Sequence, residues 1–182
     1  AGVVVSANGQ YIYVSNRDDD SVSVINARTL KVRSTAKVGH HPFGITIDED
    51  GRRLYVANVL SNTVTVLDAV NLTKIATIEV GELPYVVALA QSGKQLLVSN
   101  QDDDTVSVID TNLNNVIETI SVGETPEGID IHPDQIHAYV TNWMSGTVSV
   151  INLNTMQVEQ TIKTGQGSRA FGRFIQRTAS TD

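Results

Sequence analysis

The sequence predicts an all-β fold, a β-propeller of four-stranded antiparallel blades, and three repeated landmarks carry that prediction. The first landmark ends in asparagine and recurs at residues 13–16, 55–58, 97–100 and 139–142. The second alternates hydroxyl and valine side chains and recurs at residues 21–24, 63–66, 105–108 and 147–150. The third is a glycine followed three residues later by a proline, at residues 39–42, 81–84 and 123–126. All three recur at one step of 42 residues, and about 40–45 residues is the usual length of one propeller blade.

The second repeat contains four short runs in which apolar residues alternate with polar ones, which is the period of β-strands. These runs lie at residues 45–47, 54–57, 63–67 and 75–80. Asp50 and Gly51 join the first two runs and favour a hairpin, because both residues tolerate a positive φ. No stretch shows sustained helical spacing, so no helices are expected. A β-solenoid rung would need only ~20–30 residues, and a β-sandwich has no reason to keep one fixed period.

The repeat also predicts how the blades divide the sequence. Four complete blades are expected at residues 1–42, 43–84, 85–126 and 127–168, followed by an extra innermost strand at 171–175 and a polar tail at 176–182. A lone inner strand leaves backbone groups without partners, so we expect the sequence to be the C-terminal part of a longer ring. A closed four-bladed ring with a spare strand and an arc closed by a second copy are the alternatives.

Read together, the landmarks resemble a known family. Residues 139–142 spell Tyr-Val-Thr-Asn, and the units run from Gly-x-x-Pro through this motif to Thr-Val-x-Val. The pattern is similar to the YVTN-type β-propeller repeat family, with its lactonase-like and surface-layer-like propellers. The resemblance implies a seven-bladed ring in a periplasmic, secreted or cell-surface protein. It also implies relatives associated with quinoproteins or haem, although a shared fold does not transfer a function.

The composition excludes several classes of protein. The 182 residues carry 13 basic and 20 acidic side chains, a net charge of -7, whereas nucleic-acid-binding domains are normally basic. We therefore expect no nucleic-acid partner. The absence of cysteine excludes disulfides, thiolate zinc sites and a cysteine nucleophile. The longest apolar run, residues 85–90, is too short to cross a bilayer, so no membrane span is expected.

Two residue types recur in every repeat and are expected to serve the fold. The asparagines that end each second strand are Asn16, Asn58, Asn100 and Asn142. Their side chains are expected to bond the following backbone amides and stabilise the turn. The glycines at the crossovers between blades are Gly39, Gly81, Gly123 and Gly165. They are expected to permit the sharp passage from one blade to the next.

Function is expected where the repeats differ, in two sets of loops that emerge at the same face. One set joins the second and third strands of each blade, and the other crosses between blades. We call this face the loop rim, and it is the predicted binding face because sites usually form on loops held by a rigid scaffold. Its candidate residues are Arg17, Asp18, Asp19, His40, His41, Glu82, Asp102, Asp103, Glu124, Trp143, Met144 and Arg169.

Two groups on the loop rim suggest metal binding and also have plainer interpretations. Asp102, Asp103 and Asp104 offer the oxygen ligands that calcium prefers, but they lack the spacing of a calcium loop, and acidic turns are usually only solvated. His40 and His41 are adjacent, and neighbouring side chains of an extended segment point in opposite directions. This geometry disfavours a shared metal ion.

Other residues are ambiguous in the same way. Trp143 and Met144 either stack on a ligand or pack against a neighbouring loop. Asp130 lies within an inner strand and is expected to bond a neighbouring blade or to face the central channel. His132 and His137 flank a hairpin turn on the opposite face, and their spacing predicts no metal site.

Signatures of catalysis are missing from the sequence. Residues 165–170 match Gly-x-Gly-x-x-Ala, but no βαβ unit surrounds them as a dinucleotide site requires. No phosphate-binding loop, Gly-x-Ser-x-Gly elbow or His-Glu-x-x-His pair occurs. The sequence therefore predicts a non-enzymatic scaffold whose loop rim binds a protein, a carbohydrate or a small molecule. The alternative is an enzyme or enzyme subunit of lactonase-like or quinoprotein-associated type, with a metal or cofactor over the central channel.

Overall fold

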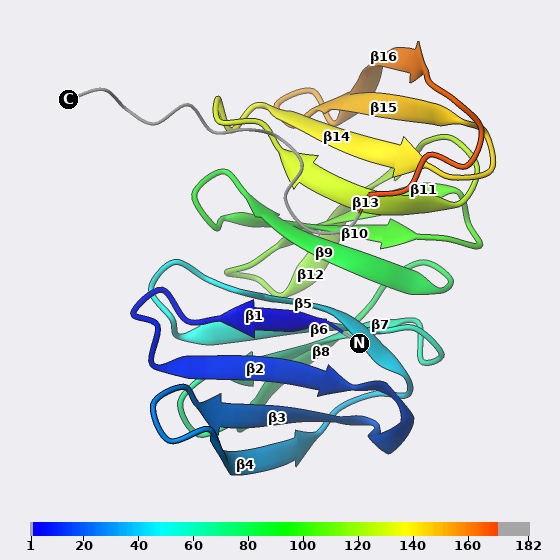
Figure 1. Ribbon diagram of the computed structural model, residues 1–182. Helices are drawn as coiled ribbons and strands as arrows, with labels where there is room; N and C mark the ends of the chain where they lie inside the picture. The colour runs from blue at the N-terminus through cyan, green and yellow to red at the C-terminus, as the bar shows by residue number, and fades with distance from the viewer. Residues whose placement is uncertain (1, 171–182) are drawn as a thin grey trace.

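The computed structural model describes residues 2–170 of the protein (Figure 1). Within this range sixteen strands form four separate four-stranded antiparallel sheets, and each sheet contains four strands that follow one another in the sequence. The chain is thus all-β and is a partial β-propeller, as the 42-residue repeat predicts. The expected extra strand at 171–175 and the tail at 176–182 lie outside the described residues.

The strands occupy equivalent ranks in the four blades. The innermost strands are β1 (Val3–Val5), β5 (Pro42–Ile47), β9 (Pro84–Ala90) and β13 (Pro126–Ile131). The second strands are β2 (Tyr11–Asn16), β6 (Arg53–Asn58), β10 (Gln95–Asn100) and β14 (His137–Asn142). The third strands are β3 (Ser21–Asn26), β7 (Thr63–Asp68), β11 (Thr105–Asp110) and β15 (Thr147–Asn152). The outermost strands are β4 (Lys31–Lys37), β8 (Lys74–Glu79), β12 (Asn115–Ser121) and β16 (Gln157–Lys163).

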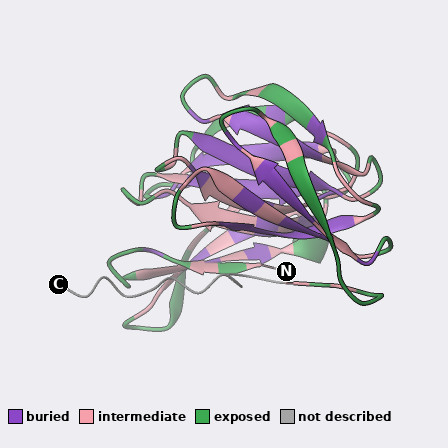
Figure 2. Ribbon diagram, turned by 90° about the horizontal axis from the view of Figure 1, so that it is seen from above, coloured by how far each residue is buried: buried purple, intermediate pink, exposed green. Residues whose placement is uncertain are grey.

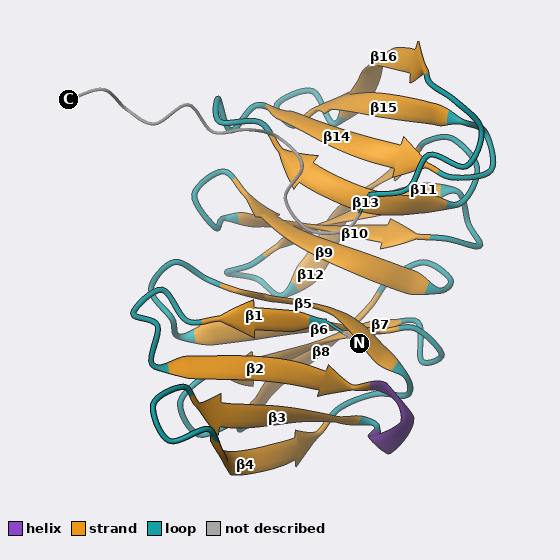
Figure 3. Cartoon of the chain, in the orientation of Figure 1, coloured by secondary structure: helices purple, strands orange, loops and turns teal. Residues whose placement is uncertain are grey.

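The blades are arranged so that their innermost strands are neighbours. Strand β5 contacts β1 and β9, and β9 also contacts β13, which produces a row of inner strands in chain order. The outermost strands are mostly exposed (Figure 2). Figure 3 shows loops at both ends of the strands and a short helix that follows β2. That helix is a single 3-10 turn, η1 (Arg17–Asp19), where the sequence predicted none.

The hydrophobic core lies between the blades. Strand β6 shows why, because its alternate side chains face opposite neighbours. Leu54 and Val56 pack in a cluster with side chains of the first blade, whereas Tyr55 and Ala57 pack in another with side chains of the third. A third cluster joins the third and fourth blades. Four described blades therefore share three cores, and each blade is stabilised by its neighbours.

Hydrogen bonds across the blade boundaries add to these cores. The Ser15 hydroxyl donates to the carbonyl of Phe43 at 2.8 Å, and Ser99 in the third blade donates to the carbonyl of Glu127 at 2.9 Å. Tyr13 donates its phenolic proton to the carbonyl of Ala69 at 3.0 Å. These bonds fix the first blade against the second and the third against the fourth, so the loops at these strand ends rest on a rigid base.

The sequence suggested that the recurring asparagines bond the following backbone amides. In the structure they bond side-chain hydroxyls instead. In the second blade the Asn58 side-chain amide donates to the hydroxyls of Thr63 at 3.0 Å and Thr65 at 2.8 Å. These two hydroxyls point the same way because they are two residues apart on strand β7. The Asn58 side-chain oxygen accepts the backbone N–H of Gly39 at 3.1 Å. In the second blade Asn58 therefore joins the third strand to the crossover that enters the blade.

Three of the recurring glycines, Gly39, Gly81 and Gly123, are explained by close approach. Gly39 is not among the glycines with positive φ, so its backbone does not require glycine. A Cβ at this position would lie 2.7 Å from the Cβ and Cγ of Asn58, which is too close for any side chain.

Within the described residues, no helix is long and apolar enough to cross a membrane.

Candidate functional site

The 42-residue step places four different side chains at one end of the inner-strand row. Phe43, Tyr85 and Glu127 each follow the first proline of strands β5, β9 and β13, and Arg169 occupies the next equivalent position. We call these four residues the axial row. Each comes just after a crossover, so the row lies where the loop rim meets the inner strands.

Two members of the axial row form an aromatic pair. The rings of Phe43 and Tyr85 stack with their centroids 4.1 Å apart and an interplanar angle of 15°. Burial and the nearby carboxylate of Glu127 raise the pKa of Tyr85, although the cations of Arg169 and Arg17 oppose this. The Tyr85 hydroxyl is therefore neutral at physiological pH.

The other two members form a bidentate ion pair. Arg169 Nε donates to Glu127 Oε2 at 2.7 Å, and Arg169 Nη2 donates to Glu127 Oε1 at 2.6 Å. Glu127 is only 1% exposed, whereas the Arg169 side chain is 42% exposed. The hydrogen bonds that Arg169 donates to Glu127 raise the pKa of Arg169 further above its ordinary value. This fork geometry is the strongest arrangement that a carboxylate and a guanidinium adopt.

Each charge of the ion pair has a further partner from the loop rim. Gln101 Nε2 donates to Glu127 Oε1 at 3.1 Å, and the Arg169 guanidinium lies 4.3 Å from the centre of the Trp143 ring. Gln101 and Trp143 are each the first loop residue after the second strand of a blade. Each precedes the charged residue that it contacts by 26 residues in the sequence. The loop rim and the axial row therefore meet at a surface of aromatic rings and planar hydrogen-bonding groups.

The structure assigns structural contacts to two predicted calcium ligands. Asp103 Oδ2 accepts the backbone N–H of Glu82 at 2.6 Å, and Asp104 Oδ1 accepts that of Thr125 at 2.8 Å. These amides belong to different crossovers, so the two carboxylates serve different loops. Ser145 makes the equivalent contact in the fourth blade. The Ser145 hydroxyl accepts the backbone N–H of Glu124 at 2.9 Å.

The two rim histidines are held differently from each other. His40 Nδ1 lies 2.8 Å from Asp20 Oδ2, and the other oxygen of Asp20 accepts the backbone N–H of His41 at 2.9 Å. These bonds lower the pKa of Asp20 below its ordinary value, the His41 amide contributing most. His41 has a φ of 52°, so this segment is not extended, although the sequence prediction assumed that it is.

The remaining predicted residues lie exposed on the loop rim. Arg17, Asp18 and Asp19 form η1, and Lys37 Nζ donates to the Asp19 carbonyl at 2.7 Å. Glu82, Asp102, Glu124 and Met144 are exposed. Of the twelve candidates, Trp143 and Arg169 are the pair brought together around a buried charge.

Sequence reasoning missed Phe43, Tyr85, Gln101 and Glu127. A signal for them existed, because residues 43, 85, 127 and 169 occupy one repeat position and are all chemically different. Asp130 was expected to bond a neighbouring blade or face the channel. In the structure it is buried, and its Oδ1 accepts the backbone N–H of Ile131 at 3.0 Å.

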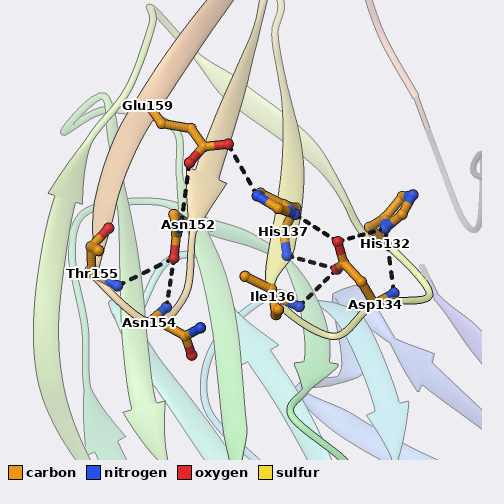
Figure 4. A network of polar contacts seen from close by, with 8 residues as sticks. All are labelled: His132, Asp134, Ile136, His137, Asn152, Asn154, Thr155 and Glu159. Atoms are coloured by element: carbon orange, nitrogen blue, oxygen red, sulfur yellow. Dashed lines mark hydrogen bonds and ion pairs between the residues drawn. The ribbon is translucent and has the colours of Figure 1, made fainter.

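One cluster on the opposite face corrects the sequence interpretation. His132, Asp134 and His137 each present a ligand atom, and these atoms lie within 4.8 Å of one another (Figure 4). The sequence had predicted no metal-ligand arrangement here. The histidines meet because the hairpin pairs them, with the N–H of His132 donating to the carbonyl of His137 at 2.8 Å.

Comparisons with known proteins agree with this fold. Residues 1–71 match the family model described as "Lactonase, 7-bladed beta-propeller". Among solved structures, a chain of the hydrazine synthase of Kuenenia stuttgartiensis matches with a TM-score of 0.84 and 26% sequence identity, over 88% of this chain. The match spans 47% of that chain, so this protein covers about half the length of that structure. No curated protein matches the sequence. The expected resemblance to lactonase-like β-propellers is confirmed.

Proposed function

We propose that this protein is a non-enzymatic binding module that holds a carbohydrate against the axial row and the adjoining loop rim. The observation that carries the proposal is the Glu127–Arg169 ion pair under Trp143. It places a half-exposed guanidinium in contact with both a buried carboxylate and an indole. The family resemblance further supports the proposal that the protein works in the periplasm, outside the cell or at the cell surface.

The blade architecture does not need this ion pair. The same repeat position is occupied by Phe43 and Tyr85 in two other blades, and their inner strands form equally well. Burying a carboxylate has a desolvation cost that even a good ion pair only roughly offsets. A feature that costs free energy and is absent from equivalent blades indicates a role other than folding.

The chemistry of the surface suits a sugar. Aromatic rings offer flat apolar faces on which the C–H face of a pyranose can lie, and carboxylates, guanidinium groups and amides bind vicinal hydroxyls through two hydrogen bonds at once. Tyr85, Gln101, Trp143 and Arg169 supply both kinds of group on one surface, and the buried Glu127 carboxylate holds the Gln101 amide and the Arg169 guanidinium in place. Pockets for small ligands usually combine apolar walls with a few such polar groups.

A glycan array and affinity electrophoresis in soluble polysaccharides would test the proposal. Trp143→Ala and Gln101→Ala should each weaken binding at least tenfold, because they remove a stacking face and a hydrogen-bonding amide. Leu60→Ala is the matched control, since Leu60 is an exposed residue of the equivalent loop in the second blade and should bind like the wild type. Equal binding by all variants, or no binding by the wild type, would contradict the proposal.

The family match supports a second candidate, a lactone-hydrolysing enzyme or a subunit of one. The matched model is described as a lactonase. Opening a lactone ring by hydrolysis produces one carboxylic acid, so a pH-stat with a panel of lactones measures this hydrolysis directly. A metal or cofactor over the central channel would belong to this alternative. Acid release that Glu127→Gln abolishes would favour the enzyme over the binding module.

We further propose that additional β-structure completes the ring. The described arc has four blades and three inter-blade cores. Val3 and Val5 of the first blade are 65% and 51% exposed, as expected for a face that another blade would cover. A preceding part of a seven-bladed ring, which the matched family model describes, or a second copy of this chain would supply the missing contacts.

A further inference from the structure

We infer that His132, Asp134 and His137 form a binding site for a divalent transition-metal ion, with Zn²⁺ as the preferred occupant. The site lies in the hairpin between β13 and β14, at the face opposite the loop rim, and is independent of the proposed sugar-binding surface. Two imidazoles and one carboxylate, with a fourth position open to solvent, are a ligand set that Zn²⁺ accepts.

The Asp134 carboxylate is already oriented as a metal ligand. Its Oδ1 accepts the backbone N–H groups of Ile136 at 2.8 Å and His137 at 3.0 Å, which fixes the side chain. Its Oδ2 then lies 2.9 Å from His132 Nδ1 and 2.6 Å from His137 Nδ1. In a tetrahedral site with bonds of about 2.0 Å, ligand atoms are about 3.3 Å apart. Both distances from Asp134 Oδ2 to the histidines would therefore lengthen by less than about 1 Å to admit the ion, and all three ligand atoms already lie within 4.8 Å of one another (Figure 4).

A second carboxylate orients His137 from behind. The Nε2 of His137 lies 3.0 Å from Glu159 Oε1 on the outermost strand β16, which leaves Nδ1 directed at Asp134. Asn152 holds Glu159 in turn, its amide donating to Oε2 at 3.2 Å. Metal-binding histidines commonly donate their other ring nitrogen to such a carboxylate, which fixes the ring and raises its basicity.

The hairpin does not need His132, His137 or Glu159 in order to fold. In the second blade a single residue, Asp48, accepts the N–H groups of Arg52 and Arg53 and closes the equivalent turn. Asp134 Oδ1 alone does the same in the fourth blade. The positions of His132, His137 and Glu159 are occupied by Asp48, Arg53 and Ile75 in the second blade, so the metal-ligand set is particular to the fourth blade.

The site is accessible to an ion from solution. The side chains of His132 and His137 are 42% and 28% exposed, and that of Asp134 is 31% exposed. An entering ion would lie between Asp134 Oδ2 and the ring nitrogens of His132 and His137. The open coordination position would then hold water or a ligand atom from a second molecule.

Isothermal titration calorimetry with ZnCl₂ on the untagged chain tests this inference, and the visible absorption of bound Co²⁺ reports the tetrahedral geometry. We expect one ion per chain, a loss of affinity of at least a hundredfold in His132→Ala and His137→Ala, and about a tenfold loss in Glu159→Gln, because outer carboxylates affect metal affinity at least that much. His40→Ala is the matched control, because it removes a histidine that contacts one aspartate only.

Two results would overturn the inference. One is no saturable binding by the wild type, and the other is equal affinity in His132→Ala and His40→Ala. His132→Asn serves as a second variant if an alanine variant has an altered circular dichroism spectrum, since His132 is partly exposed and its loss removes little packing. Neither outcome depends on sugar binding at the loop rim, so the two proposals fail separately.

Discussion

Asn58 and Gly39 show how a repeated residue pair stabilises a blade boundary. The buried asparagine uses its amide on two threonines of its own blade and its oxygen on the glycine that enters the blade. Gly39 has no room for a Cβ against Asn58, whereas a Cβ at Gly165 would meet nothing within 4 Å. One repeat position thus has two environments within the same chain.

Gly39→Ala should lower the free energy of unfolding by about 1–3 kcal/mol, because the added methyl overpacks a site whose neighbours are held by hydrogen bonds. Gly165→Ala, at the equivalent position, should change it by less than about 0.5 kcal/mol. Urea unfolding followed by circular dichroism measures both values. Similar destabilisation in the two variants would show that the glycine is needed for its backbone and not for the space.

Single residues also mark the limit of prediction from sequence. The asparagines were identified as structural, but their partners were not, because hydroxyls five and seven residues away become neighbours only when the strands pair. His132 and His137 were dismissed for their spacing along the chain. In a hairpin, however, residues that flank the turn face each other across the two strands, so spacing along the chain is the wrong measure.

At the scale of elements, the crossovers between blades adopt strained backbone that side chains from the neighbouring loop stabilise. His41, Leu83 and Thr125 all have φ near 50° without being glycine. Their backbone N–H groups donate to Asp20, Asn62 and Asp104. The acidic loops therefore have a structural role at these positions, which their charge alone did not reveal.

Asp20→Asn should lower the melting temperature near neutral pH, and the difference from the wild type should shrink in acid. The folded-state pKa of Asp20 lies below its ordinary value, so its charge stabilises the fold above the unfolded-state pKa of about 3.9. That contribution is lost as the pH falls through the lower folded-state value. At the equivalent position of the second blade, Asn62 accepts the corresponding backbone N–H of Leu83. The Asp20→Asn variant can therefore keep the hydrogen bond and lose only the charge.

Thermal melts of both proteins from pH 7 to pH 3 measure the difference. A gap that stays constant across this range would mean that the charge of Asp20 contributes nothing and that the two side chains differ only in packing.

Most of the strand order could be predicted at this scale, because alternation and turn residues are local properties. The sequence runs at 54–57 and 63–67 lie within strands β6 and β7. The axial row could not be predicted in the same way. Its ion pair joins residues 42 apart, and its significance depends on which ends of the inner strands lie together.

At the scale of the whole molecule, the described arc ends in two blades that each have one neighbour. Three hydrophobic clusters join four blades, and apolar side chains of the first blade remain open to solvent. Exposed apolar surface of this kind usually marks an interface. The sequence predicted a partial ring from the lone inner strand expected at 171–175, the family resemblance implied seven blades, and the arrangement of the described blades is compatible with a partial ring.

Multi-angle light scattering at increasing concentration should therefore show the chain associating, with the apparent mass rising above the 19.6 kDa of one copy. Val3→Lys with Val5→Lys should return it to the mass of one copy, since a charge on each exposed valine opposes burial. Val70→Lys is the control, because Val70 is similarly exposed on a turn of the second blade. A cooperative single-copy species at all concentrations would contradict association.

The sharing of each core between neighbours also has an evolutionary consequence. A blade presents one apolar face to the blade before it and another to the blade after it, and the repeat length is constant, so in-frame gene duplication could add a whole blade without creating a new kind of interface. Selection could then alter the duplicated copy at its turns while its packing stayed intact. The imidazole cluster confined to a single hairpin is the pattern that such divergence of one duplicate would leave.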